Sequence, residues 1–264
     1  MKLLLPLLLL CAALCSSTAS AADFATQMVE ATFKLFHPDS AATCFLLRRE
    51  PGDTALYLAT AGHVLERTKG DTATLVLRAP QADGAFKRRD HTIIIRQKGK
   101  PLWVQSKTDD AAVLRLVEPL PVPVPALPVT ALTDEGQVKA AGLRVCSPLF
   151  VLTFPNRTES NAAGFPLARQ GIIASHPLLP FGPQRTFLAD FTTFAGDSGG
   201  PVFVADAAGK PLVIGMALAQ INQEENVTLE FEKRTLRHPL GIGKVLHAQF
   251  LRELVERCAK PEAR

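Results

Sequence analysis

The stretch Gly196-Asp197-Ser198-Gly199-Gly200-Pro201 tells us most about how this chain folds. A serine set between glycines and after an aspartate suits a nucleophile on a tight turn, because Gly196 can adopt backbone angles closed to other residues. Such a turn directs the main-chain N–H groups of Gly196 and Ser198 toward one position, where they would stabilise a developing oxyanion. The stretch therefore predicts a nucleophile at Ser198 and an oxyanion hole formed by Gly196 and Ser198.

Two candidate partners precede this serine. A serine hydroxyl is a poor nucleophile at neutral pH and needs a base within hydrogen-bond reach. His63 lies in the segment Leu58-Ala59-Thr60-Ala61-Gly62-His63-Val64 and is the predicted base. Asp110 stands directly before the apolar run 111–114 and is favoured to hold the imidazole, with its neighbour Asp109 as the competing candidate. The order His, Asp, Ser is one of the orders in which this triad occurs.

The remaining histidines do not stand in a comparable sequence context. They are His37, His91, His176, His238 and His247.

These three segments together resemble the chymotrypsin/trypsin-like serine proteases. Residues 60–63 resemble the histidine motif of that family, residues 110–114 resemble its aspartate motif, and residues 196–201 match its nucleophile motif in full. The resemblance implies an all-β fold of two six-stranded antiparallel β-barrels with a C-terminal α-helix. It also implies cleavage of peptide bonds through a Ser-His-Asp triad and an acyl-enzyme intermediate, in a cleft between the barrels.

The chain departs from zymogen-activated members of that family. In those relatives a newly cut N-terminus pairs with the aspartate equivalent to Asp197. No Ile-Val-Gly-Gly-like start lies near Ala22, so we expect no activation cleavage of that kind. The sequence leaves open what holds Asp197 instead. We also expect no appended PDZ domain, because the chain ends soon after the predicted C-terminal helix.

The resemblance also locates the substrate pocket. It puts the base of the S1 pocket at Thr192, six residues before the nucleophile, with Thr193 beside it. It puts the wall in residues 215–220, which include Ala219, with substrate main chain paired along 218–220. No carboxylate is available at Thr192 to bind a substrate Lys or Arg, so we expect a small or medium uncharged P1 residue. The wall lacks the usual Ser-Trp-Gly, which keeps open a catalytically silent pseudoprotease that binds peptides.

The N-terminus predicts export. Lys2 supplies a positive charge, Leu3 to Leu14 form an apolar run, and Ala19-Ser20-Ala21 is a small-residue cleavage signal. We expect a signal peptide over 1–21, a mature start at Ala22 and a location in the periplasm or outside the cell. The apolar run of about 12 residues is too short for a membrane span.

Short apolar segments between turn residues predict strands in both halves of the mature chain. They cover 43–48, 54–61, 72–78, 91–96 and 111–117, then 149–154, 171–175, 186–191, 201–205 and 213–219. Five prolines between 119 and 128 exclude a central strand and indicate a connector. We therefore expect a first barrel over 22–120, a linker over 121–135 and a second barrel over 136–264, whose best helix is 244–259.

Composition excludes some partners. The net charge is +4, and the basic pairs and triplets at 48–49 and 87–89 lie near acidic residues, which indicates a solvated surface rather than a nucleic-acid site. No Cys/His spacing resembles a zinc site, and no cofactor is implied. We expect a monomer with a protein or peptide substrate. After loss of the signal peptide, Cys44, Cys146 and Cys258 could form any one disulfide or stay as thiols.

Overall fold

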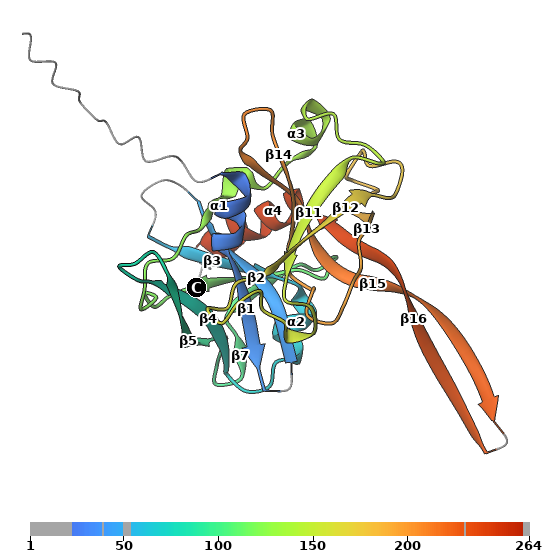
Figure 1. Ribbon diagram of the computed structural model, residues 1–264, viewed down its shortest axis with the longest axis horizontal. Coiled ribbons are helices and arrows are strands. Elements are labelled where there is room, and N and C mark those ends of the chain that lie inside the picture. The colour runs from blue at the N-terminus through green and yellow to red at the C-terminus, as the bar shows by residue number, and fades with distance from the viewer. Residues whose placement is uncertain (1–22, 39, 50–53, 230, 261–264) are drawn as a thin grey trace, which may run out of the picture.

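A computed structural model describes residues 23–38, 40–49, 54–229 and 231–260 (Figure 1). The predicted signal peptide and the mature start at Ala22 lie outside these residues. The first half contains α1 (Phe24–Ala31), β1 (Thr32–His37), β2 (Ser40–Arg48), β3 (Leu56–Thr60), α2 (Gly62–Arg67), β4 (Thr72–Pro80), β5 (Phe86–Ile94), β6 (Arg96–Gln97), β7 (Lys100–Pro101), β8 (Trp103–Gln105), β9 (Ala112–Leu116) and β10 (Leu127–Pro128).

The second half contains η1 (Val129–Ala131), α3 (Glu135–Ala140), β11 (Pro148–Thr153), η2 (Pro155–Arg157), β12 (Leu167–Ile173), β13 (Thr186–Asp190), β14 (Pro201–Ala205), β15 (Pro211–Leu229), β16 (Glu232–His247) and α4 (Ala248–Ala259). Each predicted strand segment overlaps one of these strands. No helix among the described residues is long and apolar enough to cross a membrane.

The two halves form two β structures, which confirms the all-β, chymotrypsin-like expectation. In the second half the strands β11-β12-β13-β16-β15-β14 close into a six-stranded barrel. In the first half the strands run β5-β4-β1-β2-β3-β9-β8 in an eight-stranded sheet, with β10 added on β2. Over the described residues this first sheet does not close, so it is a partial barrel rather than a six-stranded one.

The proline-rich connector packs on the first half instead of crossing free solvent. Its prolines lack the N–H that a sheet ladder needs, so residues 119–126 form no strand. Its alternating apolar side chains still pack on the first core, namely Leu120, Val122, Val124 and Ala126. Leu127 then pairs in parallel with Leu47 of β2. The predicted linker is therefore an extended cover over the sheet.

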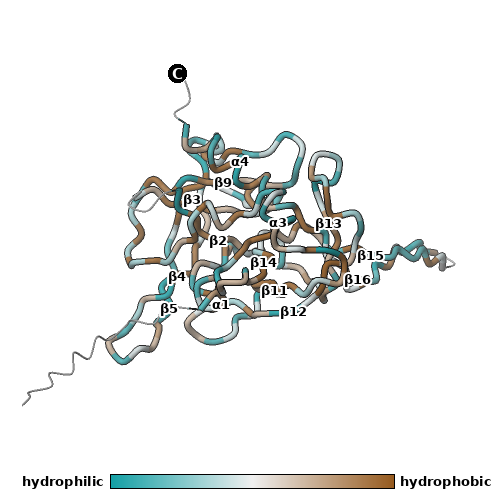
Figure 2. The backbone as a smooth tube through the Cα atoms, turned by 90° about the horizontal axis from the view of Figure 1, so that it is seen from above, coloured by the Kyte–Doolittle hydropathy of each residue, from teal (hydrophilic) through white to brown (hydrophobic). Residues whose placement is uncertain are grey.

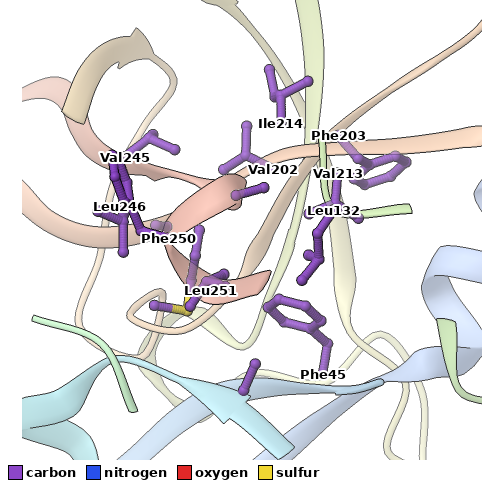
Figure 3. Close-up of a cluster of buried hydrophobic side chains, with 14 of the residues drawn as sticks. Phe45, Leu132, Val202, Phe203, Val213, Ile214, Val245, Leu246, Phe250 and Leu251 are labelled. Atoms are coloured by element: carbon purple, nitrogen blue, oxygen red, sulfur yellow. The ribbon is translucent and has the colours of Figure 1, made fainter. Parts of the chain in front are cut away.

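The C-terminal helix begins later than predicted. Residues 244–247 belong to β16, where Leu246 pairs with Thr186 of β13, and α4 begins at Ala248. The buried face of α4 contains Phe250 and Leu251 beside Phe45 of the first half (Figure 3). The helix also contacts β8 and β9. It therefore packs on both halves of the chain.

One apolar cluster joins the halves. It includes Phe45 from β2, Leu132 after η1 and Phe203 from β14, all at most 2% exposed (Figure 3). Burial of such side chains contributes roughly 1.5–3 kcal/mol each, which fixes one half against the other. The loops that carry the predicted site residues meet at this junction.

Candidate active site

His63 and Asp110 lie in direct contact. His63 is the second residue of α2, which begins where β3 ends, and its ring Nδ1 lies 2.5 Å from Asp110 Oδ2. The main-chain N–H of His63 also donates to Asp110 Oδ1 at 2.8 Å. Burial raises the pKa of Asp110, but the hydrogen bonds from the ring and main chain of His63 outweigh it and lower the pKa. The carboxylate is thus held ionised against the imidazole, with Nε2 left for a second partner.

Asp109 has a different partner. Its carboxylate receives Arg185 Nε at 2.8 Å and Nη2 at 2.6 Å, and Ser106 Oγ at 2.9 Å. Burial raises the pKa of Asp109, while these donors lower it below its usual value. The two neighbouring aspartates are therefore separated by the fold, and only Asp110 reaches the histidine.

The turn that carries Ser198 is anchored on the first half. Thr43 of β2 donates its N–H to the Ser198 carbonyl at 3.0 Å, and its hydroxyl donates to the Gly196 carbonyl at 2.8 Å. Gly199 has φ +88°, and a Cβ there would collide with the Thr43 carbonyl and the Thr60 hydroxyl. Thr60 ends β3, three residues before His63. The glycine after Ser198 therefore permits the close approach that brings the serine turn to the strand leading into His63.

Among the described residues, the hydrogen-bond partner of the Ser198 hydroxyl is a main-chain oxygen and not that histidine. The hydroxyl donates to the main-chain oxygen of Leu218 at 2.9 Å. A serine hydroxyl has one O–H, so it does not donate to His63 in this arrangement. The O–H must turn from Leu218 toward His63 before the imidazole can accept that proton.

The two predicted oxyanion donors remain without acceptors among the described residues. Gly196 has φ +98°, and the Ala195 carbonyl accepts from the Asn156 N–H at 2.6 Å. In a trans peptide the C=O and N–H point in opposite directions, so the Gly196 N–H points away from Asn156. Asn156 thus fixes the orientation of the donor peptide.

Arg169 holds Asp197, which answers the question that the sequence left open. Arg169 lies on β12, and its Nη2 atom is 2.7 Å from Asp197 Oδ1. The Asp197 side chain is only 6% exposed. The same guanidinium donates to Thr153 Oγ1 at 2.5 Å and to the Thr192 carbonyl. Asp197 Oδ2 also accepts from the Phe194 N–H at 2.8 Å. One cation therefore ties together both ends of the segment 192–197 that precedes the serine.

The pocket beside Ser198 is small. Its cavity is about 20 Å³ and is lined by Phe191, Thr193, Phe194, Asp197, Ser198, Ala217, Ala219 and Gln220. Two of the three residues predicted for this pocket, Thr193 and Ala219, are therefore in its wall. The third, Thr192, is exposed and does not line it. A volume of this size admits about one water molecule or a methyl group.

Larger hollows lie elsewhere on the described surface. One of about 560 Å³ opens between the end of β9 and the proline-rich connector. It lies on the first half and includes none of the predicted site residues. The larger hollow is therefore separate from the His63–Asp110 pair and the Ser198 turn.

Sequence reasoning missed three residues of this site: Thr43, Asn156 and Arg169. Each acts through the main chain or through a residue distant in sequence, so no local pattern marks it. The buried Asp197 was the one hint, because a buried carboxylate needs a partner.

Comparisons with known proteins bear on the family and the fold of the chain. The sequence model of a family described as "Trypsin-like peptidase domain" matches residues 42–216, which is more than half of the chain. Among solved structures, the crystal structure of Rv3671c from M. tuberculosis H37Rv, an inactive serine-to-alanine mutant, matches with a TM-score of 0.50 and 15% identity. The match covers 90% of this chain and 92% of that chain and supports the fold alone. No curated protein matches.

Proposed function

Because the chain belongs to the trypsin-like peptidase family, we propose that it is a serine endopeptidase that uses Ser198, His63 and Asp110. The observation that carries this proposal is the His63–Asp110 pair, with Nδ1 and Oδ2 2.5 Å apart, beside a serine turn anchored on the same sheet. No metal or organic cofactor enters the proposal.

The proposed reaction starts with rotation of the Ser198 hydroxyl from Leu218 toward His63. Ser198 Oγ attacks the scissile carbonyl while His63 Nε2 takes its proton, and Asp110 stabilises the resulting imidazolium. The oxyanion is received by the N–H groups of Gly196 and Ser198. His63 then gives the proton to the leaving amine, and water hydrolyses the acyl-enzyme by the same route. Loss of one oxyanion donor typically costs about 3–4 kcal/mol in the barrier.

The narrow pocket supports a small, uncharged P1 residue. Phe191 and Ala217 line it, and Thr193 contributes a hydroxyl that has no hydrogen-bond partner among the described residues. An unpaired buried hydroxyl is unfavourable, so a bound group that accepts its hydrogen bond is favoured. Cleavage of a peptide panel mainly after Lys or Arg would contradict this specificity.

A second candidate function is peptide binding without turnover. The observation that favours it is the Ser198 hydrogen bond to Leu218, in which the serine hydroxyl donates to a main-chain oxygen and not to His63. In that case the chain would keep the fold and the peptide edge but would not form an acyl-enzyme.

A fluorophosphonate probe with intact-mass detection separates the two candidates. We expect one adduct on the wild type and none on Ser198→Ala, with His63→Ala strongly slowed because the base is lost. Asp110→Asn should also be slowed, because it favours the wrong imidazole tautomer. A folded wild type that takes up no probe would contradict the endopeptidase and support the binding protein.

We propose export for the same chain, on the strength of its N-terminal sequence. Cell fractionation and N-terminal sequencing test this proposal, and the expected mature start is Ala22. A protein that keeps Met1 and stays in the cytosol would refute it.

A further inference from the structure

The most unusual surface feature is an arm formed by the outer parts of β15 and β16. We define the arm as residues 222–229 and 232–239, which pair with each other from Asn222↔Pro239 to Leu229↔Glu232. It projects from the closed barrel, and most of it is hydrophilic (Figures 1 and 2). Its described side chains are largely exposed, and Phe231 at the tip is 93% exposed.

One edge of this arm is open along its length. The pairing of β15 with β14 ends at Met216, and from Leu218 outward β15 pairs only with β16 among the described residues. The outer edge over 218–229 therefore offers unpaired main-chain groups for about 40 Å at the usual strand rise. Proteins normally shorten or cover such edges, because they act as templates for another strand.

This edge begins at the nucleophile. The Leu218 carbonyl accepts from Ser198 Oγ at 2.9 Å, and Ala219 and Gln220 line the small pocket with Ser198. A chain that pairs with residues 218–220 can therefore continue along the arm without leaving the same strand edge. Two β-bulges, one between Ala217 and Ala219 and one between Gln220 and Asn222, lie where the arm leaves the barrel. Such bulges bend the strand that carries them.

The chain direction follows from the strand. β15 runs away from Ser198, and antiparallel pairing is slightly more stable per residue than parallel pairing. An antiparallel peptide on this edge runs toward Ser198 from its N-terminus to its C-terminus. The residues on the arm are then those on the N-terminal side of the scissile bond.

We propose that the outer edge of the arm on β15, over 222–228, is a docking edge for an extended polypeptide, namely the part of a protein substrate N-terminal to the residues that pair with 218–220. This proposal rests on the proposed function and specifies its substrate class as an extended or unfolded chain. The edge would recognise the peptide by main-chain hydrogen bonds, so many peptide sequences could bind. A folded protein surface has no free extended chain to pair with the edge and would not bind.

A second copy of the chain is a poorer occupant. Two-fold antiparallel pairing of β15 with β15, centred between Glu224 and Glu225, would place Glu224 of each copy opposite Glu225 of the other. Like charges directly opposite in a sheet are unfavourable. The isolated ribbon is only marginally stable by itself, so an added strand would stabilise it.

The test uses binding, so that it does not depend on turnover. Fluorescein-labelled peptides of about four, eight and twelve residues share the same C-terminal four residues and differ only in N-terminal length. They are titrated by anisotropy against Ser198→Ala. We expect the dissociation constant to fall about tenfold from the shortest to the longest peptide, since a few net hydrogen bonds are added.

Shortening the arm should remove this dependence on length. Residues 225–236 are replaced by Asn-Gly, because Glu224 and Arg237 pair directly and this dipeptide closes a two-residue hairpin. The expected long-to-short affinity ratio of the shortened protein is near one. An undiminished ratio would overturn the proposal.

Matched proline variants identify the edge. Asn226 and Thr235 lie directly opposite each other in the ribbon, and Thr235 Oγ1 donates to Asn226 Oδ1 at 2.8 Å. In an antiparallel pair the main-chain N–H groups of two opposite residues point either both inward, toward the partner strand, or both outward. Asn226→Pro and Thr235→Pro therefore disturb the ribbon alike but block opposite outer edges. The neighbouring pair Val227→Pro and Arg234→Pro covers the other orientation.

In the pair whose N–H groups point outward, we expect the proline variant on β15 to abolish the dependence of affinity on peptide length. The matching proline variant on β16 should leave that dependence unchanged. If the β15 and β16 proline variants change the length dependence equally, the proposal is overturned. It is also overturned if light scattering shows a dimer that requires the arm and that binds long and short peptides equally. If no probe labels Ser198 but long peptides still bind through β15, the endopeptidase fails and the docking edge stands. If the probe labels Ser198 but peptide length has no effect, the docking edge fails and the endopeptidase stands.

Discussion

Replacement of Arg169 by methionine tests whether this arginine positions the catalytic turn or only stabilises the fold. The substitution keeps an unbranched side chain of similar length and removes the guanidinium that binds Asp197, Thr153 and the Thr192 carbonyl. It leaves the Asp197 carboxylate, 6% exposed, without its cation, and the Phe194 N–H still donates to Asp197 Oδ2 at 2.8 Å. We expect loss of both stability and acylation.

The size of each loss follows from the geometry. Breaking a buried ion pair by removal of one partner costs about 3–5 kcal/mol. The Arg169 side chain is 18% exposed, so water can approach Asp197 and the lower end of that range applies. If the turn shifts enough to misplace the Gly196 N–H, acylation loses a further 100- to 1000-fold, roughly the effect of one oxyanion donor.

Two measurements on the same preparations separate these effects. Urea unfolding gives the free energy of unfolding, and the second-order rate of fluorophosphonate labelling, measured without urea on folded protein, reports the catalytic turn. Arg169→Lys keeps one charge but cannot bridge three acceptors, so we expect intermediate labelling. Adding Asp197→Asn to Arg169→Met removes the unpaired charge and should restore stability more than labelling.

Arg49→Met is the matched control. Its ion pair with Glu256 is 3.2 Å long, with side chains 35% and 46% exposed, and pairs of this kind contribute about 0–1 kcal/mol. This variant should unfold and label like the wild type. If Arg169→Met is destabilised but labels at the wild-type rate, the arginine is structural and the positioning role is refuted.

Three further predictions concern other sites. Burial lowers the pKa of His247 to about 4 from 6.5, so the unfolded chain binds a proton that the folded chain refuses between these values. This group alone should lower the free energy of unfolding by about 3 kcal/mol as the pH drops from 6.5 to 4, and urea titrations of His247→Leu should show a fall that is smaller by this amount. Gly199→Ala should lower the free energy of unfolding, measured in urea, by several kcal/mol, because its Cβ would collide with strand β2 of the first half. The control Gly209→Ala also has a positive φ of +73° but has no atom within 4 Å of its Cβ, so it should lose only about 1–2 kcal/mol. Without denaturant a thiol reagent should modify exposed Cys146 within minutes and leave buried Cys44 unmodified, and rapid modification of both would contradict the described packing.

The sequence predicted the local elements because each depends on nearby residues. Glycines around Ser198 allow one kind of turn, and alternating or β-branched apolar runs favour strands whatever their partners. Prolines between 119 and 128 exclude a ladder for the same local reason. The error at the C-terminal helix has the same origin, since Leu246 fits a helical period as well as a strand and only its pairing with Thr186 decides between them.

The sequence by itself thus determined the all-β class, the glycine-rich turn at Ser198 and the order of His63, Asp110 and Ser198. Tertiary structure alone decided that Asp110 reaches the histidine while Asp109 goes to Arg185, and that Arg169 supplies the cation beside Asp197. It alone also showed that β15 extends past the nucleophile as an arm. The reason is physical: a turn or a strand is set by neighbouring residues, whereas an ion pair or an open edge depends on which distant strands the closed barrel brings together.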